Sequence, residues 1–63
     1  MDSNLEYLLN EYKERMEFLT AGLRQGNIPT MEEYRYICGQ LRGLEAACGI
    51  IVDLKNRMDN SND

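Results

Sequence analysis

The segment Gly26-Asn27-Ile28-Pro29 separates two stretches that each have the apolar spacing of a helix. Pro29 lacks a backbone N–H and disfavours helical geometry in Ile28, so no helix is expected to continue through it. Gly26 suits the position just past a helix end, where the backbone is left-handed. A connection this short between long helices favours an antiparallel hairpin. The sequence therefore predicts an all-α chain with its turn at residues 26–29.

The stretch before the turn predicts a first helix over about residues 4–25. Ser3 and Glu6 fit a capping box, in which the two side chains bind free N–H groups of the first turn. Leu8 and Phe18 widen an apolar seam whose spacing is typical of coiled coils. The seam itself consists of Leu5, Leu9, Tyr12, Met16, Leu19 and Leu23.

The stretch after the turn predicts a second helix over about residues 31–57. Thr30 and Glu33 form a second capping box, and Glu33 also suits the positive end of the helix dipole. The polar residues 59–63 predict a tail that frays. The seam that should face the first helix consists of Tyr34, Ile37, Leu41, Leu44, Cys48 and Ile51.

A neighbouring side of the second helix carries small and apolar residues that the hairpin leaves unexplained. Each glycine there costs about 1 kcal/mol relative to alanine in a helix interior. The glycines could make room for Tyr12 or Phe18 of the first helix, or they could let another chain approach closely. We favour the second explanation, because one partner helix cannot cover two seams; Gly49 has no explanation in either. The predicted protein interface consists of Tyr36, Gly39, Gly43, Ala46, Ala47, Ile50 and Leu54.

Size makes association the expected source of stability. A single domain spanning residues 1–63 buries only about 60% of its unfolded surface. Small domains usually add a disulfide, a metal or oligomerisation. Cys38 and Cys48 lie about 15 Å apart along one helix, beyond the roughly 7 Å that a disulfide spans. No His is present and the cysteine spacing matches no zinc motif, so association with copies of itself or with a partner remains.

Composition argues against several classes of function. Without a His base or a glycine-rich phosphate loop, we expect neither an enzyme nor a bound metal or cofactor. The formal charge of −4 argues against nucleic acid as the main partner, and Arg24, Arg35 and Arg42 are too few for a basic patch. No apolar run approaches the roughly 20 residues of a membrane span, and the acidic N-terminus does not fit a signal peptide. The expected protein is soluble and intracellular, in a reducing compartment.

The second helix carries a pattern of residues that resembles a known group of proteins. The pattern runs from Glu33 to Ala47 as E-Y-x-Y-x-C-G-x-[LI]-R-G-L-E-x-A, and continues with Asp53, Leu54 and Arg57. It resembles small uncharacterised proteins encoded among the head and tail structural genes of tailed bacteriophages. The resemblance covers nearly the whole chain and offers no catalytic residues to carry over. It implies a phage origin and a place in the virion or in its assembly.

These observations lead to two hypotheses from different classes. The first is a non-enzymatic structural or adaptor protein that associates through its second helix with itself or with a virion assembly such as the portal or head–tail region. The second is a small acidic inhibitor that binds a host enzyme during infection. Both place the protein in the host cytoplasm during infection, and the first also allows it in the virion.

Overall fold

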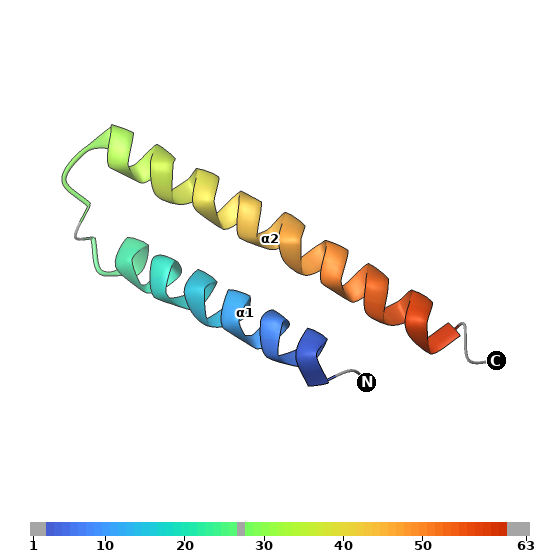
Figure 1. Ribbon diagram of the computed structural model, residues 1–63. Coiled ribbons are helices and arrows are strands. Elements are labelled where there is room, and N and C mark those ends of the chain that lie inside the picture. The colour runs from blue at the N-terminus through green and yellow to red at the C-terminus, as the bar shows by residue number, and fades with distance from the viewer. Residues whose placement is uncertain (1–2, 27, 61–63) are drawn as a thin grey trace.

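The computed structural model describes residues 3–26 and 28–60, and these residues form two helices and no strand. Helix α1 spans Ser3–Arg24 and helix α2 spans Met31–Asn60. The chain measures 51 × 16 × 13 Å, and α2 returns alongside α1 after the turn (Figure 1). The all-α class is therefore confirmed, and the structure supports the helical hairpin character that the sequence predicts.

Helix α1 ends where the sequence predicts. The Gln25 N–H donates to the Ala21 carbonyl at 3.0 Å, and the Gly26 N–H donates to the Leu23 carbonyl at 3.2 Å. Gly26 has a φ of +69°, the left-handed geometry of a helix C′ residue. Ile28 and Pro29 are outside both helices, so the helical structure is interrupted at the predicted place.

Helix α2 begins with the predicted cap. The Thr30 hydroxyl oxygen accepts the Glu33 N–H at 3.1 Å, and the Thr30 carbonyl accepts the Tyr34 N–H at 3.1 Å. The helix is longer than predicted, because it continues to Asn60 instead of ending near Arg57. Asp and Asn lower helix propensity only modestly, and no Gly or Pro stops the helix earlier. The predicted tail is thus helical at Asp59 and Asn60, while its residues 61–63 lie outside the described part of the chain.

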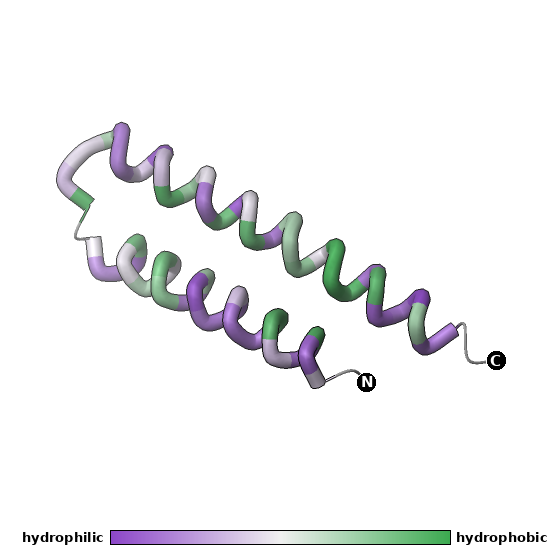
Figure 2. Tube along the Cα trace, in the orientation of Figure 1, coloured by the Kyte–Doolittle hydropathy of each residue, from purple (hydrophilic) through white to green (hydrophobic). Residues whose placement is uncertain are grey.

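The contact between the helices is one seam, with hydrophobic segments recurring along both helices (Figure 2). All six predicted seam residues of α1 are half-buried. On α2, Ile51 is the most buried side chain of the described residues, at 9% exposure. The remaining predicted members of this α2 seam are half-buried, except Tyr34, which is 46% exposed. Tyr34 lies in the first turn of α2, beside the connection, where α1 covers little of it.

Two residues that were expected to widen the α1 seam lie outside it. Leu8 is 43% exposed and Phe18 is 72% exposed, so they do not widen the contact with α2. A single partner helix covers only a narrow strip of α1, and both residues lie beyond the edge of that strip. Helix α2 also continues past the start of α1 (Figure 1), and its last apolar residues, Leu54 and Met58, are exposed.

Candidate protein interface

The side of α2 that faces away from α1 is exposed along most of its length. Ile50 and Tyr36 are 69% and 68% exposed, so neither side chain is covered by α1. At 100° per residue, Ile50 lies roughly 180° around the helix from Leu41 of the inter-helix seam. Ile50 is therefore opposite that seam, whereas Gly43 lies nearer to α1 and lines a groove with Arg15. We call the exposed side the outer face of α2, consisting of Tyr36, Gly39, Gly43, Ala46, Ile50 and Leu54.

One predicted interface residue, Ala47, differs from the others in its burial. Ala47 is half-buried, whereas the residues of the outer face are exposed. Its position around the helix lies between the outer face and Leu44, which faces α1. Its side chain is therefore partly covered within the single chain. We therefore leave Ala47 out of the outer face.

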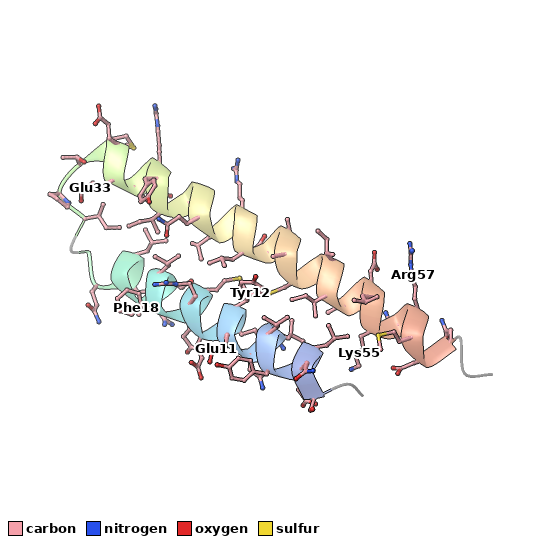
Figure 3. The ribbon with its side chains drawn as sticks, viewed as in Figure 1. Glu11, Tyr12, Phe18, Glu33, Lys55 and Arg57 are labelled. Carbon is pink, nitrogen blue, oxygen red and sulfur yellow. The ribbon has the colours of Figure 1, made fainter. Side chains whose placement is uncertain are left out.

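The glycines of the outer face do not accommodate side chains of α1. A Cβ placed on Gly39 or Gly43 would meet no other atom within 4 Å, apart from the adjacent residues and nearby helix backbone. Tyr12 is half-buried and lies between the helices (Figure 3), while Phe18 is largely exposed. The explanation that these glycines make room for Tyr12 or Phe18 is thus wrong for the single chain. Nothing in the structure explains Gly49, which also borders open space.

Sequence reasoning missed a second apolar surface, at the edge of α1 near the turn. A groove of about 270 Å³ lies there between the helices, and the exposed Phe18 ring forms part of its wall. Gly22, four residues after Phe18, leaves space on the same side of α1. That spacing was a usable signal in the sequence. The residues that line the groove are Phe18, Leu19, Ala21, Gly22, Gln25 and Ile37.

Acidic groups gather on α1 near Tyr7. The pKa of Tyr7 is raised, first by the hydrogen bond that its hydroxyl donates to Glu11 and then by the negative charges of Glu11 and Glu14. Tyr7 is 64% exposed, so these carboxylates belong to a solvent-facing surface. The outer side of α1 is therefore acidic at this end, unlike the small and apolar outer face of α2.

The described residues show no arrangement suited to metal chemistry. Within residues 3–26 and 28–60, no group of three or more His, Cys, Asp or Glu side chains is placed to hold an ion. Cys38 and Cys48 are free and half-buried. Neither of the two described helices is long and apolar enough to cross a membrane.

Comparisons with protein-family models, with curated proteins and with solved structures give no match.

Proposed function

We propose that this protein is a non-enzymatic adaptor or structural protein of a tailed bacteriophage, which acts by association through the outer face of α2. Its antiparallel hairpin would complete a helical bundle with copies of itself or with a larger phage assembly such as the portal or head–tail region. The phage setting comes from the pattern between Glu33 and Arg57. Association is the part of the proposal that rests on the structure.

The outer face of α2 is the observation that carries this proposal. Ile50 and Tyr36 expose more than two thirds of their surface, and Gly39 and Gly43 offer a backbone that another helix can approach closely. Burying such side chains contributes about 25 cal/mol per Å² of apolar surface. An apolar surface of this kind, flanked by polar residues, is typical of a protein-binding site.

Mass spectrometry of purified phage particles, together with the native mass of the free protein, tests the proposal. We expect the protein in the particles at a fixed ratio to a structural protein, and we expect Ile50→Asp to abolish its incorporation. Arg42→Asp is a comparison variant, because Arg42 is exposed on the same helix but lies off the outer face. Absence from particles and from assembly intermediates would contradict the structural role.

The second candidate function is an acidic inhibitor of a host enzyme. It is favoured by the net charge of −4 and by the carboxylates of Glu11 and Glu14 near the exposed Tyr7. An inhibitor would be made early in infection and be absent from particles. Variants of Glu11 and Glu14 would then lose binding to the enzyme, whereas an adaptor that uses the outer face of α2 would tolerate them.

A further inference from the structure

We infer that the partner of the outer face of α2 is a second copy of this chain, with the two α2 helices packed antiparallel. This inference rests on the proposed function, since it names the partner of the same face. It also fixes the register: a two-fold axis passes between Gly43 and Ala46. A two-fold contact of this kind uses one surface twice, so the surface must be complementary to itself.

The residues of the outer face from Tyr36 to Ile50 are the middle of a longer seam, which runs along nearly all of α2 and leaves Leu54 at its edge. The spacing alternates between four and three residues from Glu32 to Arg57, a distance of about 37 Å. All of these residues are exposed. Arg57 points away from α1, whereas Lys55 lies on the side of α1 and is half-buried (Figure 3). This outer seam consists of Glu32, Tyr36, Gly39, Gly43, Ala46, Ile50, Asp53 and Arg57.

The outer seam is self-complementary when two copies run in opposite directions. The two-fold axis opposes Gly43 with Ala46, Gly39 with Ile50, Tyr36 with Asp53, and Glu32 with Arg57 of the second copy. The central positions are small, which allows the helix axes to approach to about 8 Å. The large Ile50 side chain lies opposite Gly39, and the Tyr36 phenol lies opposite the Asp53 carboxylate. At each end of the seam, Glu32 of one copy lies opposite Arg57 of the other. Each opposition occurs twice by symmetry.

Charge disfavours the competing arrangements of the same seam. In a parallel pair, Glu32 would face Glu32 and Arg57 would face Arg57. If the antiparallel pair slides by one heptad, Glu32 faces Ile50 in one direction, and Arg57 faces Gly39 in the other. Both shifted registers place charged side chains opposite apolar or small residues, and both leave part of the seam without a partner residue on the second copy. Like charges and unpaired charges disfavour a register, so the two-fold axis between Gly43 and Ala46 is the favoured one.

The chain exposes more surface than a compact monomer of its mass, which leaves surface available for a second copy. The chain exposes 5110 Å², whereas a compact monomer of 7.3 kDa exposes about 4200 Å². The difference is roughly 900 Å² over the whole surface, and a standard interface takes about 800 Å² from each partner. The dimer also explains why α2 continues past α1 (Figure 1). Asp53 and Arg57 lie towards that end of α2, and in the dimer they lie beside the start of α2 in the second copy.

Reversing the charges at the ends of the outer seam tests the register. Glu32→Arg brings a new arginine side chain against Arg57 of the second copy, and Arg57→Glu brings a new carboxylate against Glu32. We expect each single variant to dissociate about tenfold more readily than the wild type in sedimentation equilibrium, because two symmetric ion pairs become repulsive. An equimolar mixture of the two variants should associate as tightly as the wild type, since every seam end is again paired with an opposite charge. Glu33→Arg is the matched control, with the same charge change in the same turn but off the outer seam; its dissociation constant should stay within about twofold of wild type.

Cysteine cross-linking gives an independent measure of the register. In a Cys38→Ala/Cys48→Ala background checked for helicity by circular dichroism, Tyr36→Cys mixed with Asp53→Cys should form a disulfide-linked heterodimer. A disulfide requires Cα atoms within roughly 7 Å. The mixture of Tyr36→Cys with Ala46→Cys, which tests the slid register, should not cross-link.

Three results would overturn the inference: a helical wild-type chain that stays monomeric at its highest soluble concentration, a dimer whose association is unchanged in all charge variants, or cross-linking only in the slid register. A monomer found at a fixed ratio in phage particles would overturn the second copy as partner and leave the proposed function standing. A dimer in the stated register that is absent from particles and assembly intermediates would retain the inference and remove the phage role.

Discussion

The hydroxyl oxygen of Thr30 accepts the backbone N–H of Glu33 at 3.1 Å, and this hydrogen bond defines the start of α2. The first N–H groups of a helix have no partner within the helix, so a side-chain acceptor at this position stabilises it. Pro29 immediately precedes the cap and disfavours helical geometry in Ile28, so the helix does not extend further back. The bounds of α2 at this end are thus determined by adjacent residues.

Thr30→Ala should therefore destabilise the protein by about 1 kcal/mol, because it removes the acceptor for the Glu33 N–H. Urea unfolding followed by circular dichroism measures the change. Thr30→Ser should retain most of the stability. Thr20→Ala, in the exposed interior of α1, is the comparison and should not destabilise, since alanine is the better helix former. Equal losses at Thr30 and Thr20 would contradict the role of the cap.

Gly26→Ala should cost about 1–2 kcal/mol, since an L side chain is strained at the φ of +69°. Gly22→Ala offers the opposite case, because Gly22 is helical and a Cβ there meets nothing within 4 Å. That change should stabilise by up to about 1 kcal/mol. Unfolding midpoints of the two variants should therefore move in opposite directions, and a shared direction would argue against the left-handed turn.

Gly43→Leu should separate association from folding. Leucine is a better helix former than glycine by about 1 kcal/mol, yet its side chain does not fit where another backbone approaches closely. We expect a helical circular dichroism spectrum at high concentration together with a native mass that falls towards the monomer. Gly49→Leu is the matched control, because Gly49 is equally open but lies off the outer face. It should keep the wild-type mass.

If Gly43→Leu loses its helix at every concentration, two explanations remain. Either the substitution damages the core of the hairpin, or the chain folds only when it associates. Leu41→Ala should destabilise the chain in either case, since Leu41 belongs to the half-buried inter-helix seam. Recovery of helix in Gly43→Ala with rising concentration would indicate that folding and association are coupled. A Gly43→Leu variant with wild-type mass and partner binding would rule out the outer face as an interface.

The raised pKa of Tyr7 predicts a stabilising contact that alkali removes. Because the hydrogen bond to Glu11 favours the neutral phenol, the folded pKa lies above the ordinary value of 10.0. The contribution to stability is present below that value and is lost as the pH rises through the folded pKa. Glu11→Ala should lower the Tyr7 pKa, measured by NMR of its ring, and Glu14→Gln should lower it less. A larger effect of Glu14 would contradict the hydrogen bond.

No metal or cofactor is expected to copurify with the protein, because the sequence has no His and its two cysteines lie ten positions apart. Elemental analysis of protein purified without a metal-affinity tag measures this. Zinc or iron at one equivalent per chain would contradict this expectation.

Most of the fold could be predicted from local signals. Gly26, Pro29 and Thr30 each act through a neighbour a few residues away, so the turn and the start of α2 follow from the sequence without knowledge of packing. The end of α2 was harder to predict, since Asp59 and Asn60 oppose a helix only weakly and nothing nearby stops it. Periodicity also identified the inter-helix seam, apart from residues at its edges such as Tyr34 and Phe18.

By itself the sequence determined two helices, their break and the existence of a second small and apolar stripe. Tertiary structure alone decided where that stripe lies relative to α1, and therefore that Gly39 and Gly43 border open space while Ala47 is partly covered. The physical reason is the range of the interactions. Caps and turns involve residues within one turn of each other, whereas the covered strip of a helix depends on the direction from which its neighbour approaches. With a single neighbour, α2 has one covered side, and its opposite side is exposed.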